Sequence, residues 1–199
     1  MLRNDLSSDR IIRVETILPV SIEEVWQAWT TPQGITSFFA PACNIELKVG
    51  GPYEILFDLE AEPGKRGSEG SHILALMPPS LLSFTWSAPP EFPEVRQQWA
   101  CVVVRFSEAN KGGTLVTLTH GGWPPSSGQP LPDSEGIAGE WDKVYQYFIR
   151  AWREVVFPRL RYRFLGGPID WDYVPDTRDQ QRFIEFFDTS VYNTHTSGG

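Results

Sequence analysis

The order of the expected elements constrains the fold of this chain more than any other feature does. A first strand at residues 11–18 is followed by two short helices, then by a run of strands, and finally by one long aromatic-rich helix at about residues 139–163. Short connections join the strands, which favours an antiparallel sheet. A curved sheet with one long helix laid into its concave face encloses space, so this order predicts an α+β fold that holds a ligand.

The two short helices after the first strand have complete start signals. Ser21 and Glu24 have the spacing of a capping box, in which each residue satisfies a backbone N–H of the other. Thr31 then offers a second N-cap, and Pro32 takes the first helical position, where a missing N–H costs nothing. The close junction predicts an angled pair of helices.

Six further strands are expected after these helices. In each of them apolar side chains alternate with polar ones or form a continuous apolar run, and glycines or prolines mark the turns. The expected strands cover residues 44–49, 53–59, 71–77, 81–87, 99–106 and 114–120. With the first strand, they give a curved antiparallel sheet of about seven strands.

The long C-terminal helix carries a wide apolar stripe. Its members are Trp141, Val144, Tyr145, Phe148, Trp152, Val155 and Val156. Pro158 lacks the N–H that would bond to the Glu154 carbonyl, so a kink is expected there. The Gly-, Pro- and Ser-rich stretch 121–139 predicts a long loop that acts as a lid over a pocket, with Trp123 in it.

The length of 199 residues fits one domain with an appendage. We expect a disordered N-terminus at 1–9, a single domain at 10–165 and a C-terminal extension at 166–199 with a disordered end. Within the extension, residues 177–187 are expected to form a short helix rich in phenylalanine. Such a helix should dock on the domain or on a second copy, which makes a homodimer through the extension one expected assembly.

Charge and composition exclude several classes of partner. The chain has 17 Lys and Arg against 25 Asp and Glu, a net charge of −8, which argues against nucleic acid. The five arginines between Arg150 and Arg163 are interpreted as a solvated helix face. No apolar run reaches the ~18 residues of a membrane span, and the first ten residues lack the apolar core of a signal peptide. We therefore expect no membrane span and a cytoplasmic location.

Histidine and cysteine, the residue types that most often bind metals, are too scattered in this sequence to form a site. The three histidines and two cysteines lack the spacing of metal ligands, so neither a metal nor a cofactor is expected. No serine or cysteine comes with a recognisable base, so no nucleophile is assigned.

Several segments resemble one known family. They are residues 20–26, 31–32, 49–53 and 113–122, together with Trp141. These segments are similar to the activator-of-heat-shock-ATPase-like branch of the START-like (SRPBCC) superfamily, across roughly residues 10–163. The resemblance implies a helix-grip fold, with a hydrophobic cavity between the sheet and the long helix. It also implies a chaperone as a partner, because such a domain helps to stimulate a heat-shock chaperone ATPase in eukaryotic relatives.

Aromatic residues from both layers are the candidate wall of that cavity. They are Tyr53, Phe57, Phe84 and Trp86 from strands and Trp141, Tyr145, Phe148 and Trp152 from the helix, with Trp123 from the lid. The alternative is that these rings simply fill a core. Arg105 alternates with Cys101 and Val103 and is expected to point inward. His120 is a weak candidate for a catalytic acid or base, and it is considered because an imidazole titrates near neutral pH. The alternative is that His120 has a structural role and bonds to the lid backbone.

Three functions remain open at this point. The first is the binding of a small hydrophobic or aromatic molecule, such as a lipid-like metabolite, without catalysis. The second is a cyclase- or aromatase-like enzyme, in which His120, Tyr53 or Tyr145 moves protons in the same cavity. The third is an adaptor that docks through the C-terminal extension without a ligand.

Overall fold

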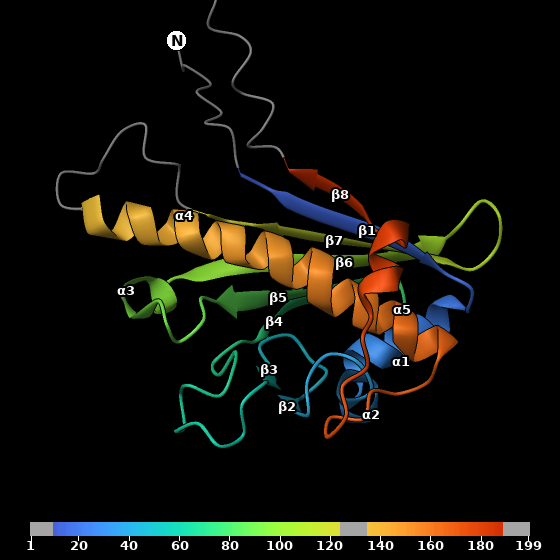
Figure 1. The fold of residues 1–199 in the computed structure, drawn as a ribbon, viewed down its shortest axis with the longest axis horizontal. Coiled ribbons are helices and arrows are strands. Elements are labelled where there is room, and N and C mark those ends of the chain that lie inside the picture. Colours follow the sequence, from blue (N-terminus) through green and yellow to red (C-terminus); the bar gives the residue numbers. More distant parts are fainter. Residues whose placement is uncertain (1–9, 124–134, 189–199) are drawn as a thin grey trace, which may run out of the picture.

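Six antiparallel strands form the main sheet of the computed structural model, which describes residues 10–123 and 135–188. They are β1 (Ile12–Leu18), β4 (Ile73–Met77), β5 (Leu81–Ser87), β6 (Trp99–Glu108), β7 (Thr114–Gly121) and β8 (Glu185–Asp188). Their order across the sheet is β4-β5-β6-β7-β1-β8. The long C-terminal helix lies across one face of this sheet (Figure 1). The predicted α+β helix-grip architecture is confirmed.

One row of side chains shows which face of the sheet is buried. Phe84 pairs with Val102, Val102 with His120, and His120 with Ile12, so four strands contribute to one rung. All four side chains are fully buried. His120 therefore shares the inner face of the sheet with Val116 and Leu118 of its own strand.

The expected orientation of Arg105 is wrong. Arg105 is exposed, and it lies on the outer face with Cys101 and Val103, which are only partly buried. The inner face of β6 is set by Val102 and Val104, which are fully buried. Both faces of this strand are apolar, so alternation alone could not decide between them.

The long helix, defined here as residues 135–165, consists of three consecutive segments. They are α4 (Glu135–Arg150), the π-helical turn η1 (Ala151–Val156) and α5 (Phe157–Leu165). The helix begins four residues earlier than expected. A kink was expected at Pro158, and the structure has a π-helical turn just before it, in which the Phe157 N–H bonds to the Trp152 carbonyl.

The predicted pair of short helices is confirmed, and so are both of its caps. They are α1 (Ile22–Thr30) and α2 (Pro32–Thr36). Ser21 and Glu24 make the reciprocal bonds of a capping box, and the Thr31 side chain accepts a bond from the Gly34 N–H. The pair lies at one end of the long helix, beside α5 (Figure 1).

Two predicted strands form a separate small sheet. β2 (Ala42–Ile45) and β3 (Tyr53–Leu56) are shorter than expected and pair with each other. Bridges from Pro52 to His72 and from Leu56 to Gly67 connect β3 to the segment that leads into β4. The main sheet therefore contains five of the seven predicted strands, and β8 is its sixth.

The C-terminal extension contains a strand where a helix was expected. Residues 177–187 were predicted to be helical, but only η2, a 3-10 helix (Arg178–Phe183), forms, and β8 follows it. β8 pairs antiparallel with β1. Residues 184–187 are Ile-Glu-Phe-Phe, a composition that suits a strand, and the β1 edge supplies backbone partners. The predicted disorder at residues 1–9 and 194–199 lies outside the described residues.

A short helix not expected from the sequence, α3 (Pro93–Arg96), follows β5. Within the described ranges, no helix combines the length and the apolar character needed to cross a bilayer.

Candidate functional site

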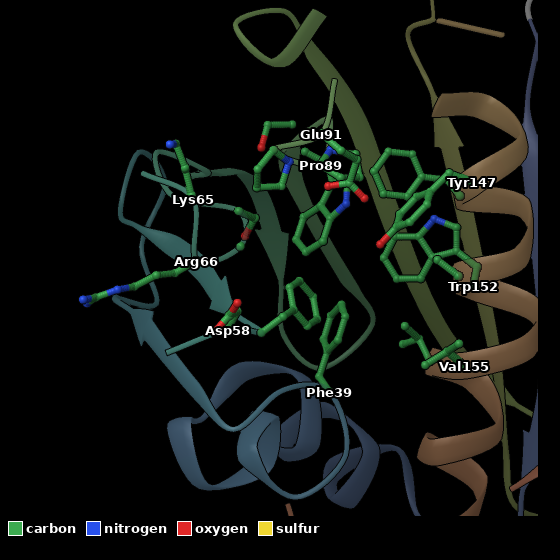
Figure 2. A pocket seen from close by; sticks show the side chains of 18 of the residues that line it. Phe39, Asp58, Lys65, Arg66, Pro89, Glu91, Tyr147, Trp152 and Val155 are labelled. Atoms are coloured by element: carbon green, nitrogen blue, oxygen red, sulfur yellow. The ribbon is translucent and has the colours of Figure 1, made fainter. Parts of the chain in front are cut away.

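A cavity of about 530 Å³ lies between the long helix, β5 and the loops that follow β3 and β5. Figure 2 shows Tyr147, Trp152 and Val155 on the helix side and Asp58, Lys65 and Arg66 on the side of the loops. The lining is mainly apolar in its floor and charged at its rim. The floor comprises Phe39, Phe57, Trp86, Phe148, Ala151, Trp152, Val155 and Val156. The charged residues are Asp58, Lys65, Arg66, Glu91 and Arg159.

Phe39 organises the aromatic floor. Its ring stacks on Trp86 at a centroid distance of 5.8 Å, and its neighbours Phe57 and Trp152 both approach edge-on at 5.9 Å. Trp86 and Trp152 lie 5.8 Å apart. These are favourable geometries for aromatic pairs, so the rings support one another without a ligand.

The cavity is open on the side of the β3 loop. Phe57 is 45% exposed, although it contacts Phe39, whereas Trp86, whose ring centre lies 6.5 Å from that of Phe57, is 4% exposed. An exposed phenylalanine beside a buried tryptophan marks an entrance to an apolar space. The cavity is therefore open to solvent, and a molecule can enter it without unfolding of the protein.

The local sequence explains how the helix wall forms. Phe148, Trp152, Val155 and Arg159 recur at intervals of three or four residues and all line the cavity. Phe39 comes from the segment just after α2, where its N–H bonds to the Ile35 carbonyl at 2.8 Å. The angled α1–α2 pair therefore places one ring between the sheet and the helix.

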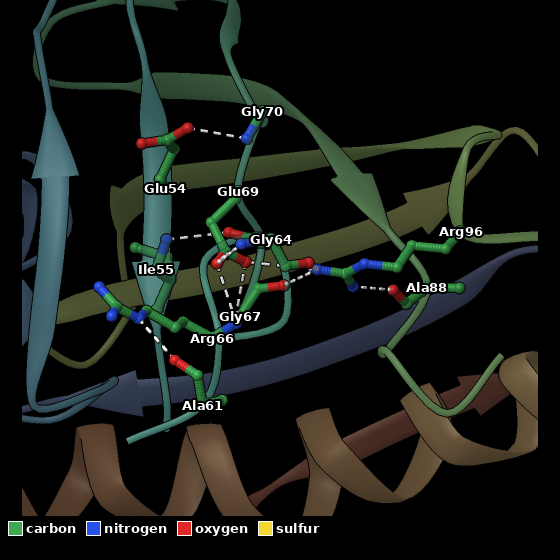
Figure 3. Close-up of polar contacts among 11 residues, drawn as sticks. Glu54, Ile55, Ala61, Gly64, Arg66, Gly67, Glu69, Gly70, Ala88 and Arg96 are labelled. Carbon is green, nitrogen blue, oxygen red and sulfur yellow. Dashed lines mark hydrogen bonds and ion pairs between the residues drawn. The ribbon is translucent and has the colours of Figure 1, made fainter. Parts of the chain in front are cut away.

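A polar network holds the loops of the cavity rim in place (Figure 3). Glu69 accepts hydrogen bonds from the backbone N–H groups of Gly64, Arg66 and Gly67 at 2.8–2.9 Å. Burial of Glu69 would raise the pKa of its carboxyl, but these backbone donors outweigh it and the pKa is lowered. The carboxylate is therefore ionised and stabilises the loop.

Arg96 joins this loop to the segment after β5. Its guanidinium donates to the carbonyls of Gly64 and Gly67, each at 2.8 Å, and to the carbonyl of Ala88. It also pairs with Glu69 at 3.3 Å. One arginine from α3 thus connects the two loops that border the cavity.

His120 lies in the core and does not line the cavity. Its Nδ1 accepts a hydrogen bond from Trp152 Nε1 at 3.0 Å, and the rings of Trp123 and Phe148 pack against it. Burial lowers the pKa of His120 well below its usual value, so the imidazole is neutral. Its Nε2 has no hydrogen-bond partner among the described residues.

The structure brings four of the predicted site residues onto the cavity wall: Phe57, Trp86, Phe148 and Trp152. The remaining aromatic candidates lie in the core. Tyr53, Phe84 and Tyr145 are fully buried, and the Tyr53 hydroxyl donates to the Trp29 carbonyl at 2.7 Å.

The other two predicted tryptophans form a cluster beside His120. Trp123 donates from Nε1 to the His120 carbonyl at 3.0 Å, and Trp141 donates to the Gln98 side chain at 3.2 Å. Of the rest of the predicted lid, residues 124–134 lie outside the described residues, and residues 135–139 belong to α4 instead of a loop.

Sequence reasoning missed Phe39, Tyr147, Val155 and Arg159 as site residues. Val155 was already in the helical stripe, and Arg159 lies four residues further along the same face, so helical spacing could have found both. Phe39 carries no such signal, because its position depends on how α2 packs. In the described ranges, no three His, Cys, Asp or Glu side chains lie close enough together to hold a metal ion.

Comparison with known proteins gives a family and a fold. The family model described as Activator of Hsp90 ATPase homolog 1-like protein matches residues 19–150. A search of the curated proteins finds no match.

Many solved structures are similar to this chain, among them the following three. A protein of unknown function from Staphylococcus aureus has a TM-score of 0.54 and 16% identity, over 79% of this chain and 94% of that one. A Bacillus halodurans protein has a TM-score of 0.54 and 23% identity, over 78% and 99%. DynU16, from the dynemicin biosynthetic locus, has a TM-score of 0.51 and 16% identity, over 84% and 49%. At these identities, the similarity concerns the fold alone.

Proposed function

The chain belongs to the family of Activator of Hsp90 ATPase homolog 1-like proteins, and from this premise we propose that it binds a small apolar or aromatic molecule in the cavity between sheet and helix. One observation carries the proposal: an open cavity of about 530 Å³ with an aromatic floor. Small-molecule sites are commonly apolar cavities of roughly 300–1,000 Å³ with a few polar groups.

The driving force would be the burial of apolar surface. Each Å² of apolar surface removed from water contributes roughly 25 cal/mol. The floor presents the rings of Phe39, Trp86 and Trp152, which suit the flat faces of an aromatic guest. We therefore expect planar apolar molecules to bind better than aliphatic molecules of equal area.

The positions of the proton-transfer candidates favour binding over catalysis. His120, Tyr53 and Tyr145 are all fully buried, and none of them lines the cavity. A general acid or base must reach the proton that it moves, directly or through one water. The cyclase-like reading therefore has less support, although DynU16 comes from a biosynthetic locus. A homodimer or a chaperone partner stays a prediction.

A titration with N-phenyl-1-naphthylamine tests the proposal. This neutral aromatic probe becomes strongly fluorescent in apolar surroundings, so wild-type protein should give a saturable signal. Ala151→Phe adds a ring where Ala151 lines the cavity, and should weaken binding by roughly tenfold or more, since a filled site must exclude the probe.

Gln146→Phe is the matched control, because Gln146 is exposed on the same helix and does not line the cavity. It should bind the probe as wild type does. Equal affinities of wild type and Ala151→Phe would show that the probe binds elsewhere and would contradict the proposal.

A further inference from the structure

We propose that the ligand of this cavity is an aromatic anion, with Arg159 binding its carboxylate. This inference rests on the proposed function and adds the chemical class of the ligand. It is carried by the position of Arg159, by the lack of an ion pair or donated hydrogen bond for its guanidinium within the described ranges, and by the aromatic side chain that supports it.

Arg159 stands at the end of the aromatic floor. It belongs to α5, lines the cavity and follows Val155 by one helical turn. It is partly buried, and burial lowers the pKa of its guanidinium. An arginine stays charged even when it is partly buried, so the cavity contains a cation that has lost part of its hydration.

No group of the described protein compensates this charge. Within the described ranges no ion pair joins the Arg159 guanidinium to a carboxylate, and none of the hydrogen bonds among those residues has it as a donor. The other cations of the lining are different. Lys65 pairs with Glu62, Arg66 donates to the Ala61 carbonyl, and both side chains extend away from the cavity (Figure 2).

An aromatic ring, and not a carboxylate, supports the Arg159 side chain. Its Cζ lies 5.3 Å from the centre of the Trp171 ring. Trp171 is in turn fixed by a hydrogen bond of 2.6 Å from its Nε1 to the Thr36 carbonyl. A cation–π contact orients a guanidinium while it leaves the N–H donors available. Those donors match the two oxygens of a carboxylate.

The neighbouring arginines show that this arrangement is specific to one residue. Arg161 donates to the Thr16 hydroxyl and to the Ile17 carbonyl, and it lies over Phe183. Arg153 is exposed and lies over Phe186. Neither Arg153 nor Arg161 lines the cavity. The prediction that the five arginines form a solvated face is wrong for Arg159, which lines the cavity, and for Arg161, which is 8% exposed.

The charge at the other end of the cavity gives the ligand a direction. Glu91 lines the cavity beside Tyr147 and raises the pKa of that phenol, after the larger effect of burial. Tyr147 and Arg159 are twelve residues apart, about 18 Å along a helix. A carboxylate is thus attracted to the Arg159 end and repelled from the Glu91 end, with the aromatic floor between them.

Two ligands that differ only in charge test the inference. 2-Naphthoate and 2-naphthamide have the same ring system, and each is titrated against protein loaded with N-phenyl-1-naphthylamine. Wild type should bind the naphthoate roughly tenfold or more tightly than the naphthamide, because hydrogen bonds to a charged group supply this preference. Added salt should reduce the preference.

Arg159→Gln should weaken binding of the naphthoate and bring its affinity close to that of the naphthamide, so the preference is lost. Arg153→Gln is the matched control and should keep the preference. If Arg159→Gln does not fold, the wild-type ratio and its salt dependence still decide, because equal affinities for both ligands overturn the inference.

The outcomes separate the two proposals. Binding of the neutral probe without any preference for the naphthoate overturns the role of Arg159 and leaves the proposed function intact. Failure of the neutral probe to bind overturns both.

Discussion

Acidification should destabilise the protein through His120. The imidazole is fully buried, and burial lowers its pKa well below the usual value of 6.5, so it is neutral in the folded state. A proton on Nδ1 would also remove the acceptor for Trp152 Nε1. Protonation therefore removes a hydrogen bond and places a charge among aromatic rings.

The size and sign of the effect follow from proton linkage. Below about pH 6.5, His120 binds a proton in the unfolded chain but not in the folded one, so stability falls as the pH falls. The loss approaches about 1.4 kcal/mol per pH unit and continues until the pH nears the folded-state pKa. Above about pH 6.5, His120 is neutral in both the folded and the unfolded state, so its full contribution to the free energy of unfolding is present.

Urea denaturation between pH 5 and pH 8 measures this effect. His120→Asn removes the titrating group and offers an oxygen to Trp152, so its free energy of unfolding should fall less steeply than that of wild type below pH 6.5. His72→Gln keeps His120 and should retain the wild-type slope. The slopes are compared between variants because carboxylates also titrate at the acid end of this range and affect the stability of every variant alike. Identical slopes for wild type and His120→Asn would refute the reasoning.

Three further predictions concern other parts of the structure. Arg96→Met removes the donors that join the two rim loops and should lower the free energy of unfolding by about 1–3 kcal/mol in urea denaturation. Proteolysis of residues 58–70 should become faster, and an unchanged rate of proteolysis would contradict this role of Arg96. Ser21→Ala removes the α1 cap and should cost about 1 kcal/mol, whereas an unchanged unfolding midpoint would refute it. Arg161→Met should release β8, because Arg161 binds β1 and Phe183, and hydrogen exchange at residues 185–187 should then accelerate; protection equal to wild type would show that β8 pairs without it.

Local signals predicted much of the fold. The capping box at Ser21 and the second cap at Thr31 depend on a few adjacent residues, and both form as expected. In β7, Val116, Leu118 and His120 share the buried face, as side chains two residues apart in a strand do. β8 was not predicted, since the phenylalanines of that segment suit a docked helix and an edge strand equally well, and only the free edge of β1 decides between them.

The candidate site was harder to predict than the fold. Tyr145 and Trp152 belong to the same helical stripe, yet Tyr145 packs in the core and Trp152 lines the cavity. The difference arises because different side chains lie opposite these two residues across the interior. The periodicity of the helix sequence carries no information about those side chains. Phe39 was missed for the same reason, because the packing of α2 and not a local pattern brings its ring between the layers.

The position of a bound probe tests most directly whether the cavity between the sheet and the long helix is the binding site. Intermolecular nuclear Overhauser effects between N-phenyl-1-naphthylamine and the protein report which side chains touch it. We predict contacts to the rings of Phe39, Trp86 and Trp152, which belong to the cavity floor. Contacts confined to the outer face of the sheet, or a probe that meets none of these rings, would contradict it.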